Sequence, residues 1–225
     1  MKVIITGSTG MVGKGALLEC IESTAVTQIL VINRRSINMQ HPKLKEIIHA
    51  DFNDLAPLQK HLSGYDACFH CMGISAVGLN EMQYTEITYS MTKELLDSLY
   101  DLNPEMTFIY VSGAGTDSSE KGRMMWARVK GKTENMVFAK GFKDAYAFRP
   151  GGILPEKGIK SRTAWYNTFY AITRPLFPLL RKMKSVTSTT KLGQAMIKVS
   201  IHPQSLKTLE NTDINALVGN AQPGS

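Results

Sequence analysis

Three glycines near the amino terminus have the spacing of a phosphate-binding turn. Gly7, Gly10 and Gly13 follow the short β-branched run Val3–Ile5 and lead into an amphipathic segment, Met11–Ile21. The first glycine would permit a tight turn, the second would let the backbone approach a phosphate, and the third would let a helix pack on a sheet. The amino end of that helix favours an anion through its free N–H groups and its dipole, so we expect a pyrophosphate there. The residues expected to hold it are Gly7, Thr9, Gly10, Met11, Val12 and Gly13.

Two arginines, Arg34 and Arg35, follow the second apolar run, Ile29–Ile32. In a dinucleotide-binding sheet this strand end lies beside the adenosine ribose, where an acidic residue holds the ribose hydroxyls of NAD. No acidic residue is present, and a guanidinium group, with paired donors and a permanent charge, suits a 2′-phosphate. The pair therefore predicts NADP (NADPH) in preference to NAD, although two solvated arginines at the start of a loop would give the same pattern.

Further candidates lie at the ends of the third predicted strand, Glu46–Ala50, and the fourth, Asp66–Cys71. The carboxyl ends of parallel strands are where α/β sheets bind ligands. A glycine after the fourth strand would let a cofactor pass close to the backbone, whereas the acidic residue after the third would lie near the adenine or simply serve a turn. These strand ends add Asp51, Phe52, Cys71, Met72 and Gly73 to the expected cofactor site.

The strongest predicted strand, Thr107–Val111, ends in Ser112, a hydroxyl inside a glycine-rich loop. A helix is expected from about Gly122 to Lys140, followed by a strand at Asp144–Phe148. The residues that end this last strand are three more candidates for the cofactor site. They are Arg149, Pro150 and Gly151.

Strands and helices alternate from residue 2 to residue 149, with further helices expected at Leu55–Leu62 and Glu81–Tyr100. This alternation predicts an α/β protein with a doubly wound parallel sheet, a Rossmann fold. The 225 residues, of which 43% are hydrophobic, suffice for one complete core. We therefore expect residues 1–225 to form a single NAD(P)-binding Rossmann domain.

The pattern changes from residue 153, and we expect residues 153–225 to form a small helical cap over the ligand cleft. Its main part would be Arg162–Lys184, which is aromatic and basic. A membrane-surface helix is the alternative interpretation of that segment. A helix at Thr189–Ser200, a short strand near Lys207–Leu209 and a last helical turn around Ile214 are also expected.

The composition limits the partners and the compartment. The net charge is +7, but the basic residues are scattered, which favours a small anionic ligand over nucleic acid. The three cysteines Cys20, Cys68 and Cys71 have no framework spacing, which indicates a reducing compartment and predicts no metal site. We find neither a cleavable signal nor a membrane-spanning stretch, and we expect a cytoplasmic monomer or homodimer.

Together these motifs resemble the short-chain dehydrogenase/reductase superfamily, specifically its atypical and extended branch of NAD(P)-binding, epimerase-like proteins. The resemblance extends from the first strand to the end of the predicted strand at Asp144–Phe148 and is loose beyond it. The segments that carry it are Thr6–Gly13, Arg34–Arg35, Asp51–Phe52, Cys71–Gly73, Val111–Ser112, Val129–Gly131 and Phe148–Gly151.

The resemblance implies a reaction carried out by a serine, a tyrosine and a lysine. In that family the tyrosine exchanges the substrate proton, the lysine lowers the pKa of the tyrosine and binds the nicotinamide ribose, and the serine bonds the substrate oxygen. Ser112 and Lys130 match, but Trp126 stands at the tyrosine position. An indole cannot titrate near neutrality, so Tyr84, Tyr89 or Lys130 itself would have to supply the proton.

Three functions are compatible with this departure. The first is an NADP-dependent oxidoreductase of a small carbonyl or alcohol, in which Ser112, Lys130 and Trp126 form the catalytic site. The second is a non-catalytic NADP(H)-sensing regulatory or scaffold protein, with Trp165–Phe177 as its partner surface. The third is a sugar-nucleotide epimerase or dehydratase, against which the short carboxyl-terminal region argues. The choice between the first two, and the substrate, stay open.

Overall fold

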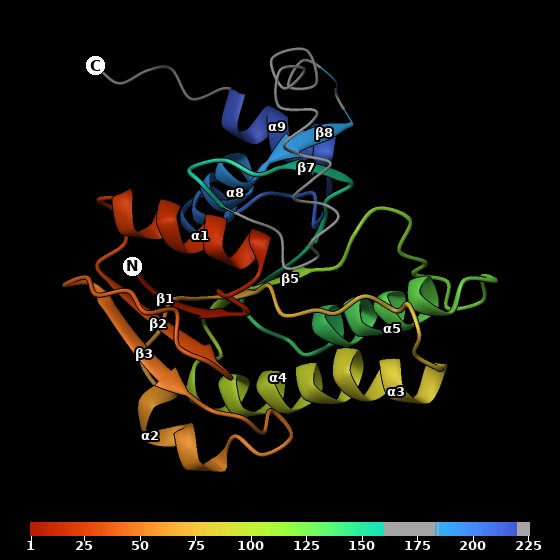
Figure 1. Ribbon diagram of the computed structural model, residues 1–225, viewed down its shortest axis with the longest axis horizontal. Coiled ribbons are helices and arrows are strands. Elements are labelled where there is room, and N and C mark those ends of the chain that lie inside the picture. Colours follow the sequence, from red (N-terminus) through yellow and green to blue (C-terminus); the bar gives the residue numbers. More distant parts are fainter. Residues whose placement is uncertain (160–182, 184, 220–225) are drawn as a thin grey trace.

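A seven-stranded parallel sheet forms the centre of the computed structural model, which describes residues 1–159, 183 and 185–219 (Figure 1). The strand order is β3-β2-β1-β4-β5-β6-β9, so the direction of winding reverses between β1 and β4. This order confirms the predicted doubly wound Rossmann sheet, whose ligand crevice lies at such a reversal. The strands are β1 (Lys2–Thr6), β2 (Gln28–Asn33), β3 (Leu44–Ile48), β4 (Ala67–His70), β5 (Thr107–Val111), β6 (Asp144–Arg149) and β9 (Thr208–Glu210).

Helices cover both faces of the sheet (Figure 1). One face carries α1 (Met11–Glu22), α8 (Thr189–Ile201) and α9 (Asn211–Gly219). The opposite face carries the short 3₁₀ turn η1 (Ala56–Leu58), α2 (Gln59–Leu62), α3 (Glu81–Thr85), the π-helical turn η2 (Glu86–Ser90), α4 (Met91–Leu102) and α5 (Met125–Ala139). None of the helices in the described part of the chain is long and apolar enough to cross a membrane.

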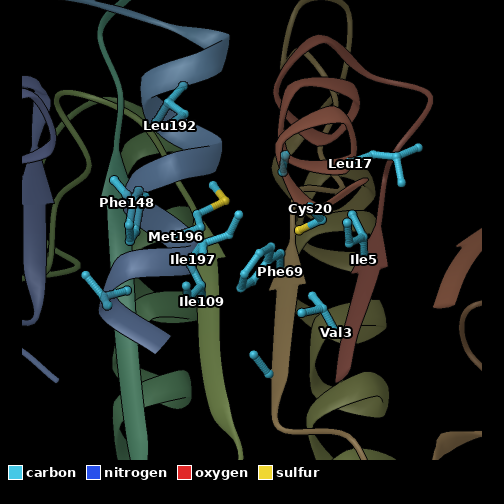
Figure 2. Close-up of a cluster of buried hydrophobic side chains, with 14 of the residues drawn as sticks. Val3, Ile5, Leu17, Cys20, Phe69, Ile109, Phe148, Leu192, Met196 and Ile197 are labelled. Carbon is cyan, nitrogen blue, oxygen red and sulfur yellow. The ribbon is translucent and has the colours of Figure 1, made fainter. Parts of the chain in front are cut away.

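The central strands are apolar on both faces because each face is covered. Val3 and Ile5 of β1 point toward α1 and α8, whereas Ile4 between them points toward α4. Figure 2 shows the first of these two cores, in which side chains of α1 and α8 meet those of the sheet. Its labelled members are Val3, Ile5, Leu17, Cys20, Phe69, Ile109, Phe148, Leu192, Met196 and Ile197.

Two helices are less regular than the sequence suggested. The segment predicted as one helix over Glu81–Tyr100 contains the π-helical turn η2, an insertion that places an extra residue in one turn. The helix predicted at Leu55–Leu62 begins instead as η1, with Pro57 in its first turn, and only then becomes α2. Proline has no N–H for an intrahelical bond, which accounts for the irregular start.

The described part of residues 153–225 joins the body of the domain. Helix α8 packs closely on α1, where a Cβ at Gly15 would lie 2.7 Å from the Thr189 Cβ, and β9 extends the main sheet. A small parallel pair, β7 (Gly152–Leu154) and β8 (Val186–Ser188), was not anticipated. Except for Met183, the predicted capping segment Arg162–Lys184 lies outside the described residues, so the cap stays a prediction there.

Candidate functional site

The glycine-rich turn after β1 is shaped by close backbone contacts. Gly7 has φ +73°, and a Cβ on it would lie 2.6 Å from the Met72 nitrogen. A Cβ on Gly13 would lie 2.4 Å from the Gly7 carbonyl oxygen. Gly10 is less crowded, since its closest neighbour, the Gly7 oxygen, would be 3.3 Å away. The fold therefore requires glycine at positions 7 and 13, while Gly10 has one close neighbour and borders a cavity.

This cavity has a volume of about 620 Å³ and lies at the carboxyl ends of β1, β2 and β4, where the winding of the sheet reverses. Its size is typical of a small-molecule site. Most of the residues expected at a cofactor site from the first four strands line it, together with Ile32 and Asn33. The lining residues are Gly7, Thr9, Gly10, Ile32, Asn33, Arg34, Arg35, Phe52, Cys71, Met72 and Gly73.

Other expected residues lie outside this lining. Met11, Val12 and Gly13 form the first turn of α1 and are not part of the cavity lining, so a cofactor contact for them stays a prediction. Asp51 is exposed, and its carboxylate accepts the N–H of Asn53 at 2.9 Å, which is the turn chemistry left open as an alternative. A cofactor contact for Asp51 stays a prediction.

A hydrogen-bond network that the sequence did not suggest supports the cavity beside the two arginines. The Asn33 amide nitrogen donates to Glu46 Oε1 at 3.1 Å, and Ser36 Oγ donates to Glu46 Oε2 at 2.6 Å. Glu46 lies on β3, thirteen positions after Asn33, and only the pairing of β2 with β3 brings the two together. The predicted strand Glu46–Ala50 gave no indication of this contact, because it joins side chains of two paired strands, and the pairing and its register come from the tertiary structure.

The residues after β5 and β6 form a second cluster, organised by Glu134 of α5. This carboxylate is fully buried and accepts the Ser112 hydroxyl at 2.5 Å and Arg149 Nε at 2.9 Å. Arg149 adds a second bond from Nη2 and so pairs with Glu134 in a bidentate manner. Lys130 Nζ donates to the Ser112 carbonyl oxygen. The structure thus brings Ser112, Lys130 and Arg149 together, and the Ser112 hydroxyl donates its hydrogen bond to the Glu134 carboxylate.

Arg149 belongs to this cluster, Pro150 and Gly151 follow it directly, and the three residues are not part of the cavity lining. The Pro150 carbonyl oxygen accepts the Ala114 N–H at 3.0 Å, and the Gly151 N–H donates to Asn211 Oδ1 at 3.2 Å. These contacts join the loop after β5 to α9. A direct cofactor contact for the three residues stays a prediction.

Trp126 occupies the position one helical turn before Lys130 on α5. Its indole ring packs over the loop after β5, with Cη2 3.3 Å from the point where a Cβ on Gly115 would lie. Gly115 has φ +83°, so the loop needs glycine there for its backbone as well as for the indole.

The three substitute proton donors have different surroundings. Tyr84 is 1% exposed, and burial raises the pKa of its hydroxyl. Tyr89 carries the Lys132 ammonium over its ring at 4.7 Å. Burial lowers the pKa of Lys130 to about 8, although Glu134 opposes the shift. Lys130 also donates a hydrogen bond to the Ser112 carbonyl oxygen.

His70, at the end of β4, is a buried residue whose role the sequence did not show. Its Nδ1 lies 2.6 Å from Thr6 Oγ1 and its Nε2 lies 3.0 Å from Thr92 Oγ1. Because the Thr92 hydroxyl already donates to the Thr88 carbonyl oxygen, Nε2 must carry the proton and Nδ1 must accept. Burial lowers the pKa of His70 to about 3. This neutral imidazole joins β1 to α4 beneath the glycine turn.

Among the described residues, no group of three or more His, Cys, Asp or Glu side chains could hold a metal ion. Cys71 borders the cavity, and burial raises the pKa of its thiol to about 12. A thiol with so high a pKa is a poor nucleophile.

Comparisons with known proteins agree on the fold. A model of the NAD dependent epimerase/dehydratase family matches residues 3–122. The chain is 26% identical to the mitochondrial protein FMP52 of Meyerozyma guilliermondii, over 70% of this chain and 67% of that protein. It is 29% identical to the mitochondrial protein fmp52 of Emericella nidulans, over 69% and 68%.

Solved structures of similar fold are more distant in sequence. An ADP-L-glycero-D-manno-heptose-6-epimerase from Helicobacter pylori superposes with a TM-score of 0.68 at 17% identity, covering 97% of this chain and 82% of the epimerase. A monomeric L-threonine 3-dehydrogenase from a metagenome gives a TM-score of 0.68 at 15% identity, with coverages of 92% and 76%. At such identities the likeness shows the fold alone.

The expected cytoplasmic location is wrong by these comparisons, because the curated relatives are named mitochondrial proteins. The expectation rested partly on three cysteines without framework spacing, which argue for a reducing environment. That argument separates reducing from oxidising compartments and does not distinguish one reducing compartment from another.

Proposed function

Since this chain belongs to the NAD dependent epimerase/dehydratase family, we propose that it binds NADP(H) in the cavity after β1 and acts as an oxidoreductase on a small carbonyl or alcohol. Membership in this family confirms the resemblance drawn from the motifs and implies an NAD(P)-type nucleotide cofactor. The observation that carries the choice of NADP is that Arg34 and Arg35 line the same cavity as the glycine turn, and that no acidic residue is among the described residues of its lining.

The residues around the cavity fit a dinucleotide. At Gly7 and Gly13 a side chain would clash with neighbouring backbone atoms, so glycine permits the tight turn. Gly10 has no side chain, which leaves room in the cavity for a pyrophosphate. Helix α1 has Gly10 at its N-cap, and a glycine has no side chain to cap the first N–H groups, so these groups and the positive end of the helix dipole suit an anion. The pyrophosphate would lie at that helix end, with the adenosine ribose toward Arg34 and Arg35.

When bound, the cofactor supplies or accepts a hydride at the substrate carbon. The chain must then move a proton at the substrate oxygen, and we assign this task to Lys130. Its ammonium group lies at the carboxyl end of β5, and its pKa of about 8 is close to neutrality, which suits general acid catalysis. The Ser112 hydroxyl donates its hydrogen bond to Glu134, so toward a substrate it can only accept one.

A non-catalytic NADP(H)-sensing protein is the second candidate function. Two observations favour it, the indole of Trp126 at the position of the family's tyrosine and the commitment of the Ser112 proton to Glu134. In both cases a group that the family uses for catalysis, the tyrosine or the serine hydroxyl, is not available to a substrate, whereas the cofactor cavity is intact.

A titration of the full chain with NADPH and with NADH, followed by fluorescence, tests cofactor choice. We expect NADPH to bind at least about tenfold tighter, a difference of roughly 1.4 kcal/mol, because guanidinium groups pair with the 2′-phosphate. The double change Arg34→Ala with Arg35→Ala should remove this preference and leave NADH binding nearly unchanged.

Arg123→Ala is the matched control, since this exposed arginine lies before α5 and does not line the cavity. Equal affinities for the two cofactors in the parent protein would contradict the assignment of NADP. The assignment would also be contradicted if Arg123→Ala lost as much NADPH affinity as the double variant of Arg34 and Arg35.

A further inference from the structure

The strand end beside Arg34 and Arg35 has an unusual construction. Asn33, the last residue of β2, is 3% exposed and uses both ends of its amide. Its oxygen accepts the Ser8 hydroxyl at 2.9 Å, and its nitrogen donates to Glu46 at 3.1 Å. An uncharged side chain held in this way offers no carboxylate to the ribose hydroxyls of a dinucleotide.

The carboxylate of Glu46 belongs to this network, and it binds the segment that follows the arginines. Its Oε2 accepts the Ser36 hydroxyl at 2.6 Å, and its Oε1 accepts the Ile37 N–H at 3.0 Å. Ser36 Oγ in turn accepts the N–H of Asn38, which has φ +50°. Because Glu46 lies on β3, it ties the loop after β2 to the neighbouring strand.

The charge of Glu46 is stabilised in this position. Partial burial raises the pKa of the carboxyl group, but hydrogen bonds from Ser36, Ile37 and Asn33 outweigh burial, so the pKa lies below its usual value. Lys14 of α1 also interacts electrostatically with this carboxylate. Burial lowers the pKa of the Lys14 ammonium group, and the charge of Glu46 opposes that shift. Glu46 is therefore ionised, and its hydrogen-bond acceptors are directed at the loop and not at the cavity, whose lining does not include it.

We propose that Glu46 is a positioning residue for cofactor selectivity. By holding Ser36 and Ile37, it fixes the loop so that Arg34 and Arg35, immediately before them, present their guanidinium groups to the 2′-phosphate of NADP(H). The inference rests on the proposed function, and it adds that selectivity depends on a carboxylate on a neighbouring strand that does not touch the cofactor.

The test compares NADPH and NADH affinities of three full-length variants by fluorescence titration. Glu46→Ala should weaken NADPH binding about tenfold and change NADH binding less than about twofold, because NADH lacks the group that the loop recognises. Glu46→Gln keeps an acceptor for Ile37 and Asn33 and should recover most of the preference. Lys45→Ala is the control on the same strand, since adjacent strand residues point to opposite faces.

Selectivity for NADPH in Glu46→Ala equal to that of the parent, or an equal loss of both cofactors, would overturn the proposal. The titration of the parent protein separates a failure of this proposal from a failure of the proposed function. If the parent binds NADPH no more tightly than NADH, both the NADP assignment and the role of Glu46 are wrong. If thermal melts show that Glu46→Ala does not fold, Ser36→Ala carries the test, since it removes one of these bonds and leaves Glu46 in place. It should lower the preference about threefold, and an unchanged ratio would again overturn the proposal.

Discussion

Replacing Trp126 by tyrosine should create or raise NADPH-dependent reduction, because it returns a titratable hydroxyl to α5. Trp126 and Lys130 are one helical turn apart, so their side chains lie on one face of the helix. Lys130 is held against the Ser112 carbonyl oxygen, so the new phenol would lie near both. Tyrosine is smaller than tryptophan, and it can occupy part of the space that the indole fills over Gly115.

The structure limits the size of this gain. A positive charge within about 4–6 Å lowers a tyrosine pKa by about 1–3 units, from about 10 toward the working pH. A positioned general acid contributes typically 10²–10⁴-fold, or about 2.7–5.4 kcal/mol of the barrier. Since Ser112 donates to Glu134 and not to a substrate, one usual donor is missing. We therefore expect the lower end, a gain of about 100-fold.

The assay follows NADPH consumption with a panel of small aldehydes and quinones. Trp126→Phe is the matched control, because phenylalanine and tyrosine differ only by the hydroxyl. Thermal melts and NADPH titrations of both variants establish that each is folded and binds cofactor. The rate difference between the two variants measures the contribution of the hydroxyl.

Two outcomes would refute this argument. If Trp126→Tyr is no faster than Trp126→Phe although both bind NADPH, the site lacks the geometry for dehydrogenase chemistry, and the cofactor-sensing function becomes the better hypothesis. If the parent is active and Trp126→Tyr slows it, the indole belongs to a working site. Alanine changes at Tyr84, Tyr89 and Lys130 then identify the donor. A Lys130 donor predicts a rate that falls as the pH rises through about 8, because the ammonium form is lost.

Two further predictions concern the glycine turn and the histidine beneath it. Gly10→Val should abolish the thermal stabilisation by NADPH, because it adds a side chain where the backbone lines the cavity. The protein should stay folded, since valine can adopt φ −85° and the 3.3 Å contact of its Cβ with the Gly7 carbonyl oxygen needs a shift of only a few tenths of an ångström. An NADPH-induced shift in melting temperature equal to that of the parent would place the site elsewhere. His70 has its pKa lowered in the folded state to about 3, so its contribution to stability is complete above pH 6.5 and is lost as the pH falls toward 3. Denaturant unfolding should show a loss of up to about 1.4 kcal/mol per pH unit in this window, and His70→Leu should lack that slope.

Much of the fold follows from local patterns. The apolar runs that became β1, β2 and β5 are short and β-branched or aromatic, and they alternate with amphipathic segments, which suffices to predict a parallel sheet. The glycine turn was also predictable, because its backbone geometry depends on the residues that form it. The boundaries of β3 and the π-helical turn η2 were not, since packing against neighbouring elements decides such details.

The sequence by itself determined the turn at Gly7–Gly13, the arginines beside it and the absence of tyrosine at position 126. Only the tertiary structure decided which side chains Glu46 and Glu134 bind. It also decided that the Ser112 hydroxyl donates to the carboxylate of Glu134. These contacts join residues on different elements, and strand register and helix placement set them. The local sequence around a residue does not determine the register of its strand. The register is selected by the free energy of packing both faces of the sheet at once.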